Sequence, residues 1–164
     1  MIKYARYVLV VVALLVFQAS VIPFISLVGV TPDLLLIYVV VLSLREGQIP
    51  GTVGGFLIGL ASDFVTGDFL GLGALTKTIA GFVAGFFFNE TSPLQPLSTY
   101  TFLVVVGVAA IAHNMIHFGF LLQGMPVGVS EIVFKFIIGT TVYTVVVALI
   151  PYFLFSARSK SIHT

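Results

Sequence analysis

Residues 51–64 read GTVGGFLIGLASDF and place a small side chain at every fourth position of an apolar stretch: Gly51, Gly55 and Gly59, followed by the carboxylate of Asp63. Four residues turn an α-helix through about 400°, so each step drifts by about 40° and three successive glycines can share a face. In lipid, helices associate by close backbone contact, which glycine permits. The stretch predicts a membrane helix that packs tightly, against a helix of this chain or of a partner.

The composition points in the same direction. Of the 164 residues, 59% are hydrophobic and 8% are charged, whereas a soluble domain carries about 25% charged residues. We therefore expect an integral membrane protein whose surroundings are the lipid bilayer. The chain has no cysteine, which excludes disulfides and thiol chemistry, and it has no basic run of the kind that binds nucleic acid.

The apolar segments predict an all-α protein with six transmembrane helices in one compact bundle, a single domain over residues 1–164. The expected spans are 5–28, 33–47, 50–65, 74–88, 99–122 and 130–155, with a polar linker at 89–98. A kink or an end of the first helix is expected near Pro23. A crossing takes about 20 residues, so the second span must be shielded or extended through its polar end.

Basic residues set the expected orientation. In a six-span arrangement they fall on one side of the membrane, and the loops opposite hold none: Lys3, Arg6, Arg45, Arg158 and Lys160. The distribution predicts that both termini are cytoplasmic.

The fourth span repeats the small-residue spacing through Gly81 and Gly85 and begins near Lys77. We expect its small face to meet that of the third span. Charges within a bilayer are usually paired, so an ion pair between Lys77 and Asp63 across the short turn is predicted. The alternative uses of these two charges are a proton relay or a polar site for a partner.

The fifth span carries the sequence HNMIH, which places His113 and His117 four residues apart on one helix face, beside Asn114. Such a pair can bind a metal, but the third ligand would have to come from Asp33, Asp63 or Glu131. The motif also lacks the glutamate of a zinc hydrolase. A polar pocket is therefore the preferred interpretation, with no metal and no cofactor.

No nucleophilic triad and no phosphate-binding loop is present in the sequence, so we expect no catalytic residues and no enzyme. The acids, the histidines and Lys77 leave an intramembrane enzyme or proton carrier as an alternative.

Three pieces of the sequence together resemble a known family. They are PDLLL at 32–36, GGF at 54–56 continuing through GLASD at 59–63, and LG at 70–71 followed by AL at 74–75. Across residues 31–88 the chain resembles the rod shape-determining protein MreD family of bacteria, and its size and nearly loop-free build are similar.

The resemblance implies a non-enzymatic, multi-pass protein of the bacterial cytoplasmic (inner) membrane that belongs to the elongasome. Such a scaffold would maintain rod shape by binding MreC and would help to organise lateral peptidoglycan synthesis. Through MreC it would act indirectly with MreB and with the RodA–penicillin-binding protein synthase.

The MreD family is also similar in fold to the substrate-binding S components of energy-coupling-factor vitamin transporters, which gives the alternative function. That reading needs a polar pocket open to the outside, formed by Asp63, Lys77, His113 and Asn114. The first span lacks the regular alanine series expected on an S component, which favours the scaffold.

Overall fold

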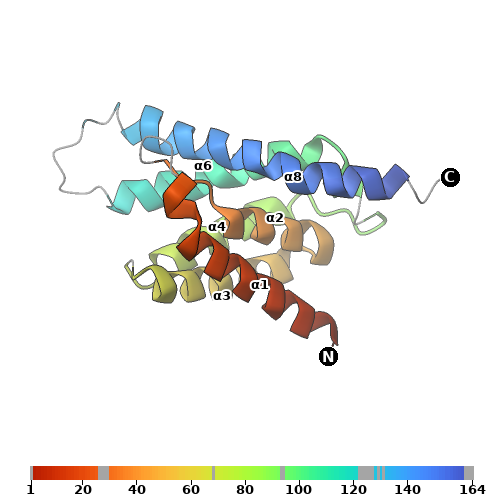
Figure 1. The fold of residues 1–164 in the computed structure, drawn as a ribbon. Coiled ribbons are helices and arrows are strands. Elements are labelled where there is room, and N and C mark those ends of the chain that lie inside the picture. The colour runs from red at the N-terminus through yellow and green to blue at the C-terminus, as the bar shows by residue number, and fades with distance from the viewer. Residues whose placement is uncertain are drawn as a thin grey trace.

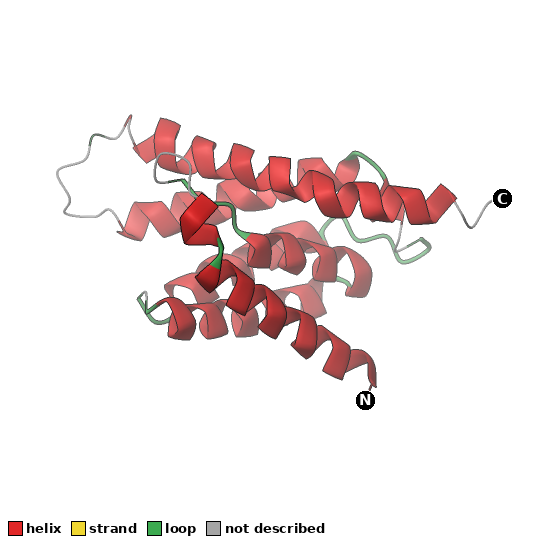
Figure 2. Ribbon diagram, viewed as in Figure 1, coloured by secondary structure: helices red, strands yellow, loops and turns green. Residues whose placement is uncertain are grey.

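The computed structural model describes residues 2–25, 30–67, 69–92, 95–121, 128, 130 and 132–160, and these form a helical bundle (Figures 1 and 2). The long helices are α1 (Ile2–Ser20), α2 (Leu34–Glu46), α3 (Gln48–Thr66), α4 (Leu72–Gly85), α6 (Thr101–Leu121) and α8 (Thr140–Lys160). The short elements are the 3₁₀ turn η1 (Ile22–Ile25), α5 (Gln95–Ser98) and the π-helical segment η2 (Ile132–Gly139), which leads into α8. The all-helical prediction is confirmed for this part of the chain.

The first helix is shorter than the predicted span. It ends at Ser20, close to Pro23 where a kink or an end was expected, and a 3₁₀ turn that contains Pro23 follows it. Proline has no N–H group to continue an α-helix, which explains an end before this position. The predicted polar linker at 89–98 contains the short helix α5 in its last four residues.

Within the residues that the structure describes, three helices are long and apolar enough to cross a membrane: Gln48–Thr66, Thr101–Phe120 and Val133–Ala157. The apolar part of α1, Ala5–Ser20, and α4 are shorter. The 13 residues of α2 extend only about 20 Å at 1.5 Å per residue, less than the roughly 30 Å of a hydrocarbon core. Six full crossings therefore stay a prediction.

The short helix α2 lies at the centre of the bundle and contacts α1, α3, α4, α6 and α8. Its fully buried side chains include Leu35, Leu36, Val39 and Val40. The helix starts where the carboxylate of Asp33 accepts a hydrogen bond from the backbone N–H of Leu36, a typical N-cap. Surrounding helices thus shield a segment that is too short to span a bilayer unaided.

The glycines of α3 and α4 bring these two helices together backbone to backbone. A Cβ on Gly55 would overlap the backbone carbonyl of Lys77, and one on Gly59 would overlap that of Gly73. In the other direction, a Cβ on Gly81 would overlap the carbonyl of Gly51. The small faces of the two helices therefore meet within the chain.

The glycines do not all pack against the same part of the neighbouring helices. A Cβ on Gly51 would overlap the side chain of Ser43 on α2, and one on Gly85 would collide with Gln48 at the start of α3. The drift of about 40° per four residues explains why the first glycine of the series faces a different helix from the next two.

The ends of the long helices lie at two opposite ends of the bundle. Both termini lie at one end of the bundle, and at the other end α1, α3 and α6 finish while α2, α4 and α8 begin (Figure 1). This second end, which we call the polar end, carries the site described next.

Candidate polar cavity

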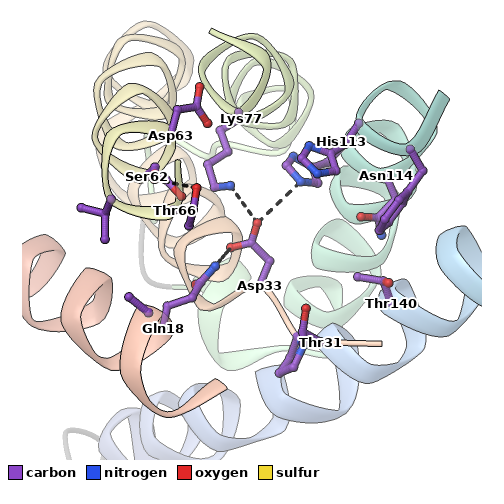
Figure 3. A pocket seen from close by; sticks show the side chains of 16 residues that line it. Gln18, Thr31, Asp33, Ser62, Asp63, Thr66, Lys77, His113, Asn114 and Thr140 are labelled. Atoms are coloured by element: carbon purple, nitrogen blue, oxygen red, sulfur yellow. Dashed lines mark hydrogen bonds and ion pairs between the residues drawn. The ribbon is translucent and has the colours of Figure 1, made fainter. Parts of the chain in front are cut away.

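A cavity of about 640 Å³ opens at the polar end of the bundle (Figure 3). Residues at the end of α1, α3 and α6 and at the start of α4 and α8 line it, together with the segment before α2. It includes the residues expected to form a polar pocket, which are Asp63, Lys77, His113, Asn114 and His117. It also includes several that were not expected there: Gln18, Thr31, Asp33, Ser62, Thr66 and Thr140.

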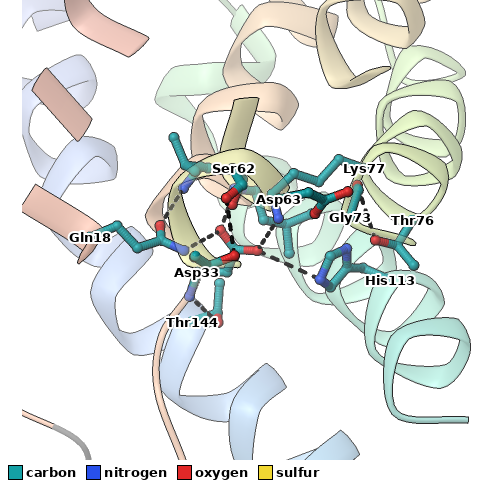
Figure 4. A network of polar contacts seen from close by, with 12 residues as sticks. Gln18, Asp33, Ser62, Asp63, Gly73, Thr76, Lys77, His113 and Thr144 are labelled. Atoms are coloured by element: carbon teal, nitrogen blue, oxygen red, sulfur yellow. Dashed lines mark hydrogen bonds and ion pairs between the residues drawn. The ribbon is translucent and has the colours of Figure 1, made fainter. Parts of the chain in front are cut away.

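Asp33 is the centre of the polar contacts, and the sequence analysis treated it only as a possible metal ligand. Its Oδ2 lies 2.8 Å from Lys77 Nζ and 3.6 Å from His113 Nε2 (Figure 4). Its Oδ1 accepts hydrogen bonds from the Leu36 N–H at 2.9 Å and from Gln18 Nε2 at 3.4 Å. Asp33 is only 9% exposed, so its charge depends on these partners.

Lys77 does not pair with Asp63 as predicted. Its side chain, 5% exposed, extends from α4 to Asp33 instead. The carboxylate of Asp63 is engaged nearer to its own helix, since Oδ2 accepts from the N–H of Gly71 at 2.8 Å and from the N–H of Ala74 at 3.3 Å. These N–H groups lie at the start of α4, where backbone donors lack partners within the helix and a negative charge is favoured.

The contacts of Asp63 explain why glycines lie at positions 71 and 73, a short distance after it in the sequence. Gly71, which precedes α4, has a φ of 97°, a left-handed conformation that favours glycine. A Cβ on Gly73 would overlap Asp63 Oδ1. The carboxylate thus fastens the end of α3 to the first turn of α4, and glycine makes room for it.

The HNMIH segment faces the cavity from α6. The rings of His113 and His117 stack with a centroid separation of 5.5 Å and an interplanar angle of 11°. Asn114 Nδ2 donates a hydrogen bond to Thr141 Oγ1 on α8 at 3.0 Å. The Nδ1 atom of His113 is buried and makes no hydrogen bond of good geometry within the described part of the chain.

The structure groups no three potential metal ligands of the His, Cys, Asp and Glu types among the residues it describes. Glu131, one of the three candidates for a third ligand, lies outside those residues.

Gln18 is the residue that sequence reasoning missed. Its Oε1 accepts from the Leu35 N–H at 3.2 Å while its Nε2 donates to Asp33, so one amide links α1 to the first turn of α2. The signal was present, because Gln18 is the one polar side chain between Tyr7 and Ala19. The backbone N–H of Asp33 also donates to Thr144 Oγ1 on α8 at 3.2 Å.

The arrangement suits binding better than covalent chemistry. A buried ion pair at the floor fixes the shape of the cavity, while hydroxyl, amide and imidazole groups along its walls offer hydrogen bonds. Comparison of the chain with protein-family profiles, with curated proteins and with solved structures gave no match.

Proposed function

We propose that this protein is a non-enzymatic scaffold of the bacterial cytoplasmic membrane, similar to MreD, that binds MreC and helps to organise lateral wall synthesis. The proposal rests on the family-like segment at 31–88. The observation that supports it is the place of that segment in the structure. Its residues form α2, α3 and α4, and its glycines and Asp63 make the contacts that join α3 to α4.

In this proposal the chain crosses the membrane six times with both ends in the cytoplasm. Arg6 lies near the start of α1 and Arg45 near the end of α2, at the same end of the bundle as the two termini. Positive residues favour the cytoplasmic side. The polar end would then face the outside, where MreC has its soluble part.

The glycine face between α3 and α4 is filled by the chain itself, so a partner's single span would have to pack on an outer face of the bundle. The five long helices around α2 offer exposed apolar side chains there, and we choose one residue on each as a probe: Val12, Phe56, Phe82, Val108 and Val146. None of the five lines the polar cavity.

The test is co-purification with MreC from the same genome, followed by photo-crosslinking from each of those five positions in turn. A scaffold should copurify, and its crosslinks to MreC should concentrate on one helix or on two neighbouring helices. Failure to copurify with a protein that elutes as a folded monodisperse species, or crosslinks spread evenly over all five, would argue against the proposal.

A second candidate function is the solute-binding S component of a transporter, and the polar cavity is what favours it. The cavity brings together the four residues that this reading required, and its volume lies within the range of about 300–1,000 Å³ typical of small-molecule sites. Mass spectrometry of protein purified from its host membrane tests it. A stoichiometric small molecule together with a bound ATPase complex would favour transport over the scaffold.

A further inference from the structure

The cavity at the polar end has a buried floor and an exposed rim. Asp33, Lys77 and Asn114 are buried at the floor, whereas Thr31 and Thr66 at the rim are exposed. A small molecule can therefore approach from the end of the bundle and contact groups that lie within it. The charged and polar groups at the floor and walls decide which class of molecule can bind.

Each charged group that lines the cavity is already compensated by the protein. Lys77 and Asp33 form an ion pair, and Asp63 accepts two backbone hydrogen bonds at the start of a helix. An ionic ligand would bring a new charge into a site of low dielectric without finding a counter-charge, which is costly. The charge balance therefore favours an uncharged ligand.

The polar groups that remain call for hydrogen bonds. His113, whose ring lines the cavity, has a buried Nδ1 that makes no hydrogen bond of good geometry among the described residues, and the backbone of Thr76 is its nearest polar neighbour. A buried polar atom of this kind is normally satisfied by protein, water or ligand. The side chains of Ser62 and Thr140, both less than 10% exposed, add hydroxyl groups to the walls.

We infer that this cavity binds a small uncharged polar molecule that carries hydroxyl or amide groups. The inference goes beyond the proposed scaffold role and does not depend on it. It also specifies the substrate class of the second candidate function.

The chain contains no cysteine, so a single introduced thiol reports on the cavity. We would purify Ser62→Cys, in which the new thiol lies on the cavity wall, and Leu70→Cys, whose side chain is exposed outside the cavity at the same end. Each would be treated with hydroxyethyl, sulfonatoethyl and trimethylammonioethyl methanethiosulfonate, which are neutral, anionic and cationic. The thiolate forms a mixed disulfide and releases methanesulfinate in all three cases.

After normalisation to Leu70→Cys, the neutral reagent should modify Ser62→Cys about tenfold faster than either charged reagent, the low end of the range by which local charge alters ion access. Equal or faster modification by a charged reagent would overturn the inference. So would an absence of reaction with all three at both Ser62→Cys and Thr140→Cys, because the cavity would then be closed. Thr140→Cys repeats the measurement on another helix in case one variant does not fold.

A matched charge variant tests the reason for the selectivity. In the Ser62→Cys background, Asp33→Asn leaves Lys77 without its carboxylate, and the anionic reagent should then accelerate while the cationic reagent does not. An unchanged order of rates would show that the ion pair does not set the selectivity and would overturn the argument from charge balance. Co-purification with MreC is measured on the same samples, so the scaffold proposal stands or fails separately.

Discussion

The turn between α3 and α4 and the cluster around Asp33 each hold a buried carboxylate at the same end of the molecule, but by different means. Asp63 is held by backbone N–H groups that lie 8 and 11 residues away in the sequence. Asp33 is held by side chains from α1, α4 and α6, up to 80 positions away. The first carboxylate fastens a local hairpin, and the second ties the whole bundle together.

Removal of the lysine should have the largest effect, because it strands the Asp33 charge. Lys77→Met should lower the free energy of unfolding by about 3–5 kcal/mol, the usual result of breaking a buried pair on one side. The measurement is equilibrium unfolding in mixed micelles of mild detergent and dodecyl sulfate.

The double variant Lys77→Met/Asp33→Asn is the control for that prediction. It removes both charges and should recover part of the lost stability, because no buried charge is then left unpaired. Additive losses in the double variant would show that the two charges do not depend on each other.

The close contact of α3 with α4 is tested by Gly55→Leu. Its side chain would collide with the backbone of Lys77, which cannot rotate away as a flexible side chain can. We expect a loss of about 3 kcal/mol, at the upper end of the effects of overpacking, seen as a lower Tm by size-exclusion chromatography after heating.

The matched control is Gly119→Leu on α6, where a Cβ would meet nothing within 4 Å. This variant should keep the Tm of the parent protein. If both variants behaved alike, the glycine contact would not be what holds the hairpin.

Asp63→Ala should lower the free energy of unfolding by less than Gly55→Leu does, because it removes two hydrogen bonds but leaves no opposite charge unpaired. Loss of a helix cap of this kind costs about 1–2 kcal/mol, and hydrogen exchange should accelerate at the first turn of α4 before it does elsewhere. If hydrogen exchange became faster throughout the Asp33 cluster instead, the two carboxylates would not stabilise the protein independently of each other.

Gln18→Leu should have the smallest effect and should lower the free energy of unfolding by about 1 kcal/mol. It replaces a partly buried amide that makes hydrogen bonds with an apolar group of similar size. The readout is limited proteolysis of the α1–α2 connection, which should become faster while cleavage between α3 and α4 is unchanged. Equal acceleration at both places would indicate global loosening rather than release of α1.

The sequence predicted best what is decided locally. Helical structure and a close α3–α4 hairpin follow from apolar runs and from the spacing of Gly55 and Gly59, because both depend on neighbours along the chain. The N-cap role of Asp33 was missed, although a polar residue directly before an apolar run is a typical helix start. Pro23 indicated where the first helix would kink or end, but the apolar sequence continues through the 3₁₀ turn, so the apolar run alone overstates the length of the helix.

The sequence could not decide between partners that are distant along the chain. Lys77 has two carboxylates within plausible reach, and the nearer one in sequence, Asp63, was the wrong choice. The outcome depends on how α2 sits between α4 and α6, which periodicity within one helix does not encode. Gln18 was missed for the same reason, because its value depends on the position of α1 beside the first turn of α2.

The backbone and side chain of Asp33 join α2 to α1, α4, α6 and α8 at one point. A tilt of any one of those four helices must lengthen at least one contact to this residue. Their movements are therefore mechanically coupled, and a force applied to the outside of one helix is felt at the floor of the cavity.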